Sequence, residues 1–498
     1  MQRLRLFTAL TLGACLLPFA HAQQHATVTD TNSAHATASP ALQITLAPDA
    51  PVLSTFMGLG IEFDPYQNPP SPARWKTIEQ RVAWAHPGFF RVMSSAQDYC
   101  LGFDAQGKPI FVWQHPKAAA QARLNKLYAV LNFAQQHHIS VYLGEWSPPG
   151  ALGIHSPADP RWPAMIADFV AYLVHVRHYT VIRHYIFFNE PNGQWMWPHS
   201  APDFDAWSTG IRHLRRDFNA LGLQQIAIAG PDNSGDMAWF DRSVKALHND
   251  FGAWEMHIYA TDAQVFGDQI ETQLAQARQT ILTDDPNGAS KERFIAESGL
   301  VTGKIEALDR QPRVRTFQYG VEMSDYVAQI ARAGWMGADA WDLDDAMHGD
   351  GHGMLKLWGF WNSSPDASMA IRPWFYTWSL MSRLFPAGAQ IVAIHSTPAP
   401  PRFRVTAAHW SSNAVPETAV MLVNDSDAPR TVALSLPGLK GRALTIYRYF
   451  RYDRPANAAG LAVPAASIRA RRKDEPLTLH LPSAGVVFVT TADAEAVP

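Results

Sequence analysis

The stretch HYIFFNE, His184 to Glu190, sets a run of aromatic and aliphatic side chains directly before an amide and a carboxylate. A short run of this composition predicts a buried β-strand. Burial of a carboxylate costs free energy unless the group is hydrogen-bonded or paired with a cation. Two tryptophans, Trp195 and Trp197, follow Glu190 closely in the chain. The stretch therefore predicts a strand whose carboxyl end carries a chemical function beside aromatic surfaces.

Similar apolar runs recur along the chain and alternate with segments of helical character. The predicted strands are Thr55–Phe63, Gly88–Met93, Ile139–Trp146, His184–Glu190, Gln225–Pro231, Trp254–Ala260, Arg293–Gly299 and Gly337–Leu343. The predicted helices are Ala118–His137, Trp162–Tyr179, Phe204–Leu221, Gln264–Leu282 and Arg315–Ala333. Strands that alternate with helices indicate a parallel sheet, and eight such strands favour a (β/α)8 TIM barrel. We expect this barrel over residues 41–385.

The composition changes beyond Pro386. Short β-type runs such as AVMLVND (419–425), LTIYRYF (444–450) and GVVFVTT (485–491) are separated by Pro, Gly and Asn. This pattern predicts a small C-terminal β-sandwich over residues 386–498. A similar run, ALQITLAP, precedes the first barrel strand, and we expect residues 41–53 to pair with the sandwich.

The N-terminus has the features of an export signal. Residues 1–22 combine a basic start, an apolar stretch and an A-x-A cleavage site that ends at Ala22. We expect a secreted or periplasmic protein, with residues 23–40 as a disordered spacer. The alternative is a lipoprotein anchored through Cys15, because LGAC (12–15) resembles a lipobox. The apolar residues that follow Cys15 disfavour this alternative.

Composition excludes several other classes of protein. The chain has 498 residues, of which 17% are charged, and a formal net charge of -3, so we expect no nucleic-acid partner. No run outside the signal reaches the ~20 apolar residues of a membrane span. Its cysteines are Cys15 and Cys100, so no internal disulfide is expected once the signal is removed. Cys100 is expected to be a small buried apolar residue. The sequence specifies no oligomeric state.

Chemically capable residues stand at the end of nearly every predicted strand. They are Glu62, Arg91, Glu145, Trp146, Asn189, Glu190, Asp232, Asn233, His257, Tyr259, Glu297 and Trp341. TIM barrels carry their active sites at the carboxyl ends of the strands, so this pattern predicts a site. Glu190 and Glu297 end strands four and seven, which lie opposite each other in a barrel of eight. Two carboxylates that face each other in this way are what the hydrolysis of a glycosidic bond requires.

NEP at the end of strand four, with FIAES at strand seven, resembles the clan A retaining glycoside hydrolases over the whole barrel. Further positions fit that pattern in strand order, namely Arg91, Asn189, His257, Tyr259 and Trp341. EWSPPG (145–150) and WSLMSRLFPAGAQI (378–391) are most similar to glycoside hydrolase families 30 and 39. The sequence does not decide between them, since the strand-seven motif is AESGL and FFNEP lacks the Trp that often precedes NEP in family 39.

The resemblance implies that Glu190 is the general acid/base and Glu297 the nucleophile of a double displacement with retention. It also implies that Asn189 binds the sugar 2-hydroxyl. The apolar strand before Glu190 should raise its pKa and keep it protonated. A cation such as Arg91 and the Tyr259 hydroxyl should lower the pKa of Glu297. The reaction requires no cofactor.

Aromatic and acidic side chains supply candidate contacts to the carbohydrate. The candidate sugar platforms are Trp146, Trp195, Trp197 and Trp341, with core packing as the alternative for each. Glu62, Asp64 and Glu145 could bind substrate hydroxyls, but a solvated or salt-bridged acid is the commoner fate of such residues.

We therefore expect an exported retaining β-glycoside hydrolase that acts on a poly- or oligosaccharide. The alternative from another class is a non-catalytic carbohydrate-binding protein on the same scaffold, which the presence of both glutamates disfavours. A third reading is a metal-dependent hydrolase. The loop MHGDGHG contains His348, Asp350 and His352, but these are too few for a complete site, so no metal is expected. The sugar, the linkage and endo or exo action depend on loop geometry and stay open.

Overall fold

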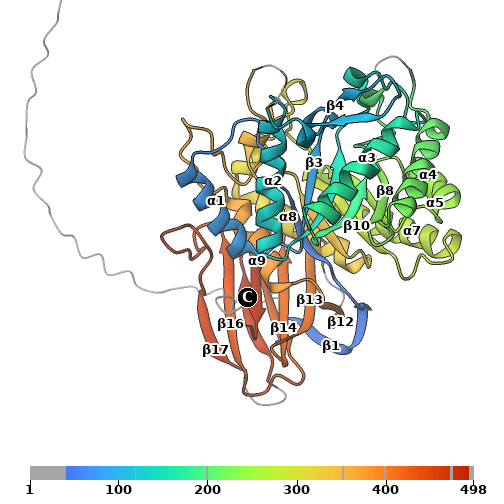
Figure 1. Ribbon diagram of the computed structural model, residues 1–498. Coiled ribbons are helices and arrows are strands. Elements are labelled where there is room, and N and C mark those ends of the chain that lie inside the picture. Colours follow the sequence, from blue (N-terminus) through green and yellow to red (C-terminus); the bar gives the residue numbers. More distant parts are fainter. Residues whose placement is uncertain are drawn as a thin grey trace, which may run out of the picture. The chain divides into compact units, whose positions relative to one another are not determined.

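The computed structural model describes residues 41–117, 119–197, 200–349, 351, 353–397, 400–470 and 475–492. The predicted signal and spacer, and the metal candidates Asp350 and His352, lie outside the described residues. Eight parallel strands close into a barrel in the order β10-β11-β2-β3-β6-β7-β8-β9. Helices surround these strands, so the predicted TIM barrel is confirmed (Figure 1).

Each barrel strand overlaps one of the predicted runs. The strands are β2 (Gly58–Glu62), β3 (Phe89–Ser94), β6 (Ser140–Glu145), β7 (Ile182–Ile186), β8 (Ala227–Ser234), β9 (Ala253–Ala260), β10 (Glu292–Leu300) and β11 (Gly337–Ala340). A separate hairpin of β4 (Cys100–Phe103) and β5 (Pro109–Phe111) follows β3. Because β7 ends at Ile186, Asn189 and Glu190 lie in the loop beyond it.

The helices include all five predicted ones and others between them. They are α1 (Pro72–Ala85), α2 (Gln121–Gln136), α3 (Arg161–Ala171) with a π-helical continuation (Tyr172–Val176), α4 (Phe204–Ala220), α5 (Met237–Leu247), α6 (Asp262–Phe266), α7 (Gln269–Asp284), α8 (Phe317–Arg332) and α9 (Pro373–Leu384). Single 3₁₀ turns lie in the loops at Ala96–Asp98, Val112–Gln114, Gly150–Leu152, Gln194–Met196, Glu306–Leu308, Pro312–Arg315 and Asp345–Met347. Helix α9 was not predicted because it is buried on nearly all sides and lacks an amphipathic pattern.

Aromatic side chains fill the interior of the barrel. The Tyr142 ring lies 4.8 Å from Phe89 and 4.5 Å from Phe294, measured between ring centroids, and all three are buried. Met93, Ile186 and small residues complete this inner core. Because an apolar plug leaves no path for water along the barrel axis, the polar side chains collect at the carboxyl ends of the strands.

The remaining long strands form one mixed sheet in the order β17-β16-β19-β14-β13-β12-β1-β15-β18. They are β1 (Leu42–Leu53), β12 (Gln390–Ser396), β13 (Phe403–Ser412), β14 (Val415–Asn424), β15 (Arg430–Ser435), β16 (Ala443–Phe450), β17 (Ala466–Arg469), β18 (Leu477–Leu481) and β19 (Gly485–Thr490). Apolar side chains from both halves of this order share one core, so the sheet curls over itself. The predicted sandwich is thus one continuous curled sheet, in which β1 pairs with β12 and β15.

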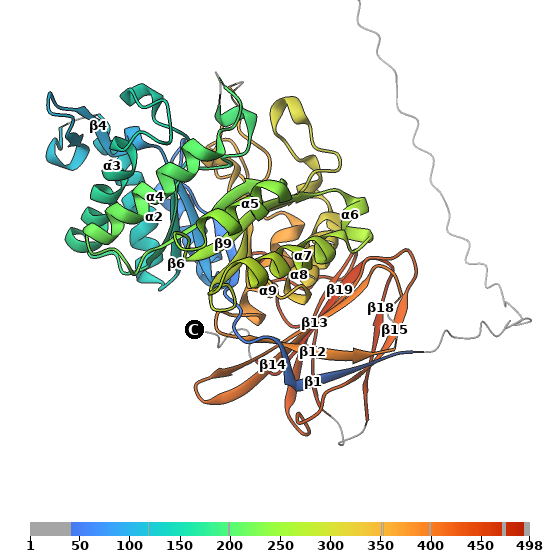
Figure 2. The ribbon, with the colours of Figure 1, turned by 90° about the vertical axis from the view of Figure 1, so that its right-hand side faces the viewer.

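Helix α8 joins the barrel to the curled sheet. It contacts β10 and β11 of the barrel, and also β13, β14 and β19 of the sheet (Figure 2). Beside it, the hydroxyl of Tyr449 on β16 donates a hydrogen bond to the Phe317 carbonyl at 3.0 Å. The two rings stack with 4.6 Å between centroids. The sheet therefore supports the barrel through apolar packing with specific polar contacts.

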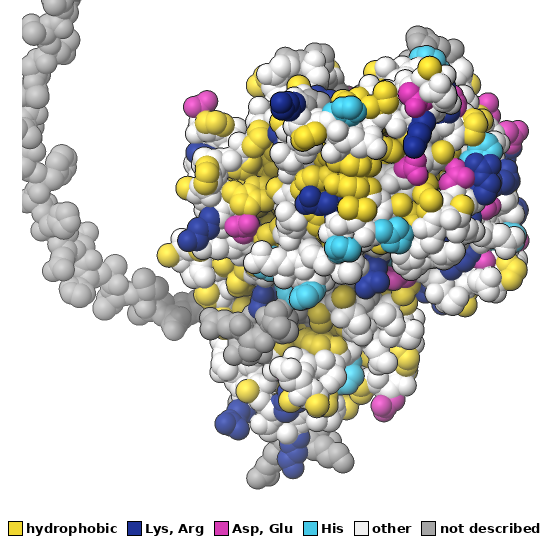
Figure 3. All heavy atoms as spheres, viewed as in Figure 1, with side chains coloured by type: hydrophobic (Ala, Val, Ile, Leu, Met, Phe, Trp, Pro, Cys, Tyr) yellow, Lys and Arg dark blue, Asp and Glu magenta, His cyan; other side chains and the backbone are white. Residues whose placement is uncertain are grey.

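Within the described residues, no helix combines the length and apolar character needed to cross a bilayer. On the face shown in Figure 3, Lys and Arg side chains are scattered among uncharged and hydrophobic ones and form no single basic patch. Cys100 is buried with a free thiol.

The contact between Tyr449 and helix α8 should contribute measurably to stability. Tyr449→Ala removes a buried ring and should lower the free energy of unfolding by about 3–5 kcal/mol. Tyr452, in the same segment, is 96% exposed, so Tyr452→Ala should change stability by less than about 0.5 kcal/mol. Chemical denaturation of both variants measures the difference. Equal midpoints would show that this packing does not stabilise the fold.

Candidate active site

Strand periodicity decides which side chains enter the barrel. Along β9, Met256 and Ile258 pack in the core outside the barrel. Because successive side chains of a strand point to opposite faces, Glu255, His257 and Tyr259 face the barrel axis. His257 and Glu255 are fully buried there. One strand thus places three polar side chains in a row beneath the barrel mouth.

The same alternation turns Glu145 away from the site. Tyr142 on β6 faces inward, and so Leu143 and Glu145 face outward. The Glu145 carboxylate accepts hydrogen bonds from the Tyr99 hydroxyl and from the Trp162 indole, the latter at 2.8 Å. Burial raises the pKa of Glu145 to about 8. The expectation that Glu145 could bind substrate is therefore wrong, because it is a structural group outside the barrel.

A β-bulge brings Glu297 into the barrel. Phe294 and Ala296 on β10 belong to the inner core, so strict alternation would turn the next residue outward. The register between β10 and β9 shifts between Ile295 and Glu297. One extra residue at this point reverses the alternation. Ala296 and Glu297 consequently both face inward, and the carboxylate reaches the centre of the site.

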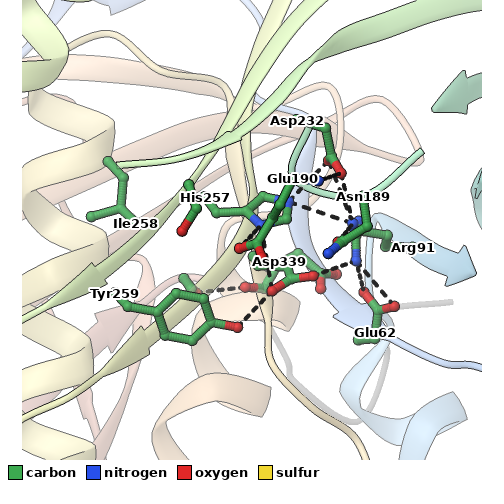
Figure 4. A network of polar contacts seen from close by, with 12 residues as sticks. Glu62, Arg91, Asn189, Glu190, Asp232, His257, Ile258, Tyr259 and Asp339 are labelled. Carbon is green, nitrogen blue, oxygen red and sulfur yellow. Dashed lines mark hydrogen bonds and ion pairs between the residues drawn. The ribbon is translucent and has the colours of Figure 1, made fainter. Parts of the chain in front are cut away.

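Arg91 is the centre of the polar network (Figure 4). Its Nη1 donates to Glu297 Oε1 at 2.6 Å and to Glu62 Oε2 at 3.1 Å. Its Nη2 donates to Asn189 Oδ1 at 2.8 Å and to Asp232 Oδ2 at 3.1 Å. The side chain is fully buried, and these carboxylates raise its pKa further despite the opposing effect of burial. Arg91 therefore fixes side chains from the ends of several strands at once.

Glu190 lies in a strained loop conformation. Its φ of 46° is in the left-handed region, which is uncommon for a residue with a side chain. Its backbone N–H points at Asp232 Oδ2, 3.3 Å away, and its Oε2 accepts a hydrogen bond from the Trp195 indole at 2.9 Å. A Cβ on Gly193 would lie 2.3 Å from the Trp195 ring, so this position requires glycine. The loop thereby holds the Glu190 carboxylate in a fixed orientation.

His257 lies between two carboxylates. Its Nδ1 is 3.0 Å from Glu190 Oε1, and its Nε2 is 2.9 Å from Asp232 Oδ1. Burial alone would lower the pKa of His257, but the charges of Asp232 and Glu297 raise it well above the usual value. Only the imidazolium donates from both ring nitrogens, and the raised pKa favours this charged form.

The pKa values of the two candidate catalytic carboxyl groups shift in the directions opposite to those expected from the sequence. Burial favours a raised pKa for Glu190, but the hydrogen bond and charge of His257 outweigh it and lower the pKa. Burial raises the pKa of Glu297, and the charges of His257 and Arg91 offset this only in part. Both predicted directions were wrong. The apolar strand before Glu190 is visible in the sequence, but the contact between the Glu190 carboxylate and His257 is not.

The two carboxylates lie close together on either side of His257. Their nearest oxygens and His257 Nδ1 lie within 4.8 Å of one another. Glu297 Oε2 also accepts a hydrogen bond from the Tyr259 hydroxyl at 2.6 Å. The Glu190 side chain is 13% exposed and that of Glu297 6%. Both groups therefore retain some access from the barrel mouth.

The tryptophan candidates occupy different environments. Trp341 is buried, and its ring stacks on His348 with 4.9 Å between centroids, while Trp146 meets it edge to face. Trp195 is 61% exposed at the mouth. Trp197 is buried and donates its indole N–H to the Pro191 carbonyl. Trp197 thus belongs to the core rather than to a sugar-binding surface.

Buried acids beneath the site were missing from the predicted set. Glu255 and Asp339 are fully buried, their carboxylate oxygens have no hydrogen-bond partner among the described residues, and burial raises both pKa values strongly. Burial also raises the pKa of Glu62 strongly and that of Asp64 to about 7. Both Glu255 and Asp339 stand at inward positions of their strands. Strict counting of strand alternation would have found them.

Among the residues that the structure describes, two groups of side chains have the spacing of metal ligands. Glu190, His257 and Glu297 lie within 4.8 Å of one another, as do Asp232, Glu255 and His257. Both groups depend on His257, whose ring nitrogens already lie 3.0 Å from Glu190 Oε1 and 2.9 Å from Asp232 Oδ1. His348 lies 3.3 Å from Asp64, and burial lowers its pKa to about 3.

Comparison with solved structures identifies relatives of the fold. A glycoside hydrolase family 30 endoxylanase from Clostridium papyrosolvens matches with a TM-score of 0.63 and 12% identity over 90% of this chain and 99% of that chain. A family 39 enzyme from Xanthomonas axonopodis pv. citri matches with a TM-score of 0.62 and 14% identity over 92% of this chain and 99% of that chain. A family 51 α-L-arabinofuranosidase from Thermotoga petrophila matches with a TM-score of 0.63 and 13% identity over 90% of this chain and 99% of that chain. No family model and no curated protein matches the sequence. The chain thus has the fold of these clan A glycoside hydrolases, as the resemblance predicted.

Removal of the Arg91 charge should destabilise the protein in a pH-dependent way. Arg91→Gln leaves buried carboxylates without their cation and should lower the free energy of unfolding by about 3–5 kcal/mol. Those carboxyl groups then bind protons more tightly in the folded state, so the deficit should grow as pH rises from acidic to neutral. The exposed Arg123 pairs with Asp98, and Arg123→Gln should cost less than about 1 kcal/mol. Denaturation at several pH values measures both, and a pH-independent deficit for Arg91→Gln would contradict the electrostatic account.

Proposed function

We propose that this protein is an exported retaining β-glycoside hydrolase that cleaves a poly- or oligosaccharide by double displacement. The observation that carries the proposal is the Glu190–Glu297 pair, whose nearest oxygens lie within 4.8 Å at the mouth of the barrel. Retaining enzymes place their carboxyl groups about 5–5.5 Å apart, whereas inverting enzymes need about 6.5–9.5 Å to admit a water molecule. The fold shared with endoxylanases and an arabinofuranosidase adds support.

In the first step, Glu297 attacks the anomeric carbon while the bond to the leaving oxygen breaks. Arg91 and Tyr259 each hold one oxygen of Glu297, which orients the carboxylate for attack. Glu190 gives a proton to the leaving oxygen. The product of this step is a glycosyl ester on Glu297, with Glu190 ionised.

In the second step, Glu190 acts as a base and removes a proton from water. The hydroxide attacks the anomeric carbon on the face that the leaving group vacated, and the bond to Glu297 breaks. Two inversions give net retention. Asn189, fixed by Arg91 beside the pair, is placed to bind the neighbouring sugar hydroxyl.

The environment around the pair suits a carbohydrate. The exposed Trp195 ring lies directly beside Glu190, where it can cover an apolar sugar face. Xylan, arabinoxylan and aryl glycosides of xylose, arabinose and glucose are the first substrates to test, given the named activities of the structural neighbours. Export rests on the signal-like residues 1–22, and N-terminal sequencing of the mature protein tests it.

The stereochemistry of the product tests the proposed double displacement. Incubation of the protein with these substrates and a wider polysaccharide panel, followed by proton NMR of the fresh product, should show the anomeric configuration of the substrate. An inverted product would exclude Glu297 as nucleophile. Binding without turnover across the panel would favour the carbohydrate-binding alternative. Activity lost on chelation and restored by a metal would favour the metal-dependent alternative.

Substitution of each glutamate by alanine separates the roles of the two carboxylates. Glu297→Ala should abolish turnover on every substrate. Glu190→Ala should lower the rate about 10²–10⁴-fold for a poor leaving group but much less in the glycosylation step for an activated aryl glycoside, which needs little proton donation. Glu271→Ala on the outer helix α7 is the matched control and should retain full activity. Equal losses for Glu190→Ala on both substrates would refute its assignment as the acid.

A further inference from the structure

The proton donor Glu190 has an unusual partner in His257. A carboxyl group that must deliver a proton is normally kept protonated by apolar surroundings. Here the carboxylate instead accepts a hydrogen bond from a buried imidazolium at 3.0 Å and from the Trp195 indole at 2.9 Å. These contacts stabilise the ionised carboxylate. The proton that the reaction needs therefore lies on His257 Nδ1 in this arrangement.

Asp232 contacts both His257 and Glu190. Its Oδ1 lies 2.9 Å from His257 Nε2, and its Oδ2 lies 3.3 Å from the backbone nitrogen of Glu190. Asp232 has a φ of 54°, at a point where the register between β8 and β9 shifts. The bulge directs the carboxylate toward His257 and the Glu190 loop together. Figure 4 shows the side chains of Asp232, His257 and Glu190 close together.

We propose that His257, held by Asp232, stores the proton that Glu190 delivers to the leaving oxygen. This inference rests on the glycosidase function proposed above. Asp232 acts as a positioning residue, because it touches the acid/base only through its backbone and through His257. His257 is the proton donor to Glu190 Oε1.

The proton transfers balance over a full cycle. When substrate binds, the proton moves from His257 Nδ1 to Glu190, which leaves a neutral imidazole that still donates from Nε2 to Asp232. Glu190 then protonates the leaving oxygen as Glu297 bonds to the anomeric carbon. In the second step, Glu190 takes a proton from water, the hydroxide displaces Glu297, and Glu190 returns the proton to His257. The net reaction consumes one water molecule and restores both groups.

Titratable and charged groups from the neighbouring strands surround His257. They are Arg91 on β3, Glu190 after β7, Asp232 on β8, Glu255 on β9, Glu297 on β10 and Asp339 on β11. Arg91 Nη2 lies 3.4 Å from His257 Nε2 and opposes the imidazolium, whereas the ionised acids favour it. Asp232 is the nearest acid that does not itself take part in bond making. Its removal should therefore change the proton affinity of His257 without removing a reacting group.

The pH dependence of the reaction tests the proposal. Asp232→Asn removes the carboxylate at Nε2, so His257 should lose its proton at a lower pH. The basic limb of kcat/KM for a phenyl glycoside should move down by about one pH unit or more. The 2,4-dinitrophenyl glycoside needs little proton donation and should show no such shift. Asp285→Asn makes the same change at a buried site that binds Trp254 and Lys291, and it should leave both profiles unchanged.

The proposal would be overturned if the basic limb of kcat/KM in Asp232→Asn stayed at the wild-type pH, or if it shifted equally for both substrates. A second measurement does not depend on activity or on the folding of that variant. In ¹⁵N-histidine NMR of the wild-type chain, one imidazolium signal should persist above neutral pH and vanish in His257→Gln. Absence of such a signal would also overturn the proposal. If the signal is present but no glycoside is cleaved, the proposed glycosidase function fails, whereas the protonated state of His257 is confirmed.

Discussion

The buried guanidinium of Arg91 is the contact on which the rest of the site depends. It bonds to Glu297, Glu62, Asn189 and Asp232, which come from different strands and loops. A lone buried charge is costly, and this cation is compensated only when those strands close into a barrel. The site is therefore complete only in the closed barrel. The curled sheet behind α8 stabilises the barrel without entering the site.

The site contains more acids than cations. Arg91 and His257 are surrounded by ionised Glu190 and Asp232 and by several acids whose pKa values burial raises. Acids that stay neutral add no charge repulsion to the site. The result is a preorganised network in which the proposed reaction moves protons between side chains that are already in contact. Such a network stabilises developing charge without reorganisation, which is the main electrostatic requirement of catalysis.

Sequence reasoning located the strands well because each apolar run is long enough to be recognised by composition alone. It found Arg91, Asn189, Glu190, His257, Tyr259 and Glu297, all of which the structure brings together. It assigned Glu145 to the mouth and missed Asp339, since it read strand ends without counting alternation. It also reversed the proton affinities of Glu190 and Glu297, because a pKa depends on neighbours from distant parts of the chain.

The sequence by itself determined the barrel, the β-strand character of the C-terminal region and most of the residues that could react. Periodicity and composition are local properties, and they suffice for those conclusions. Only the tertiary structure decided which listed residues meet. The bulge after Ile295 turns Glu297 inward, and the shift at Asp232 directs that carboxylate to His257. Bulges and buried charge pairs depend on how strands pair and pack in the folded chain, so no local pattern encodes them.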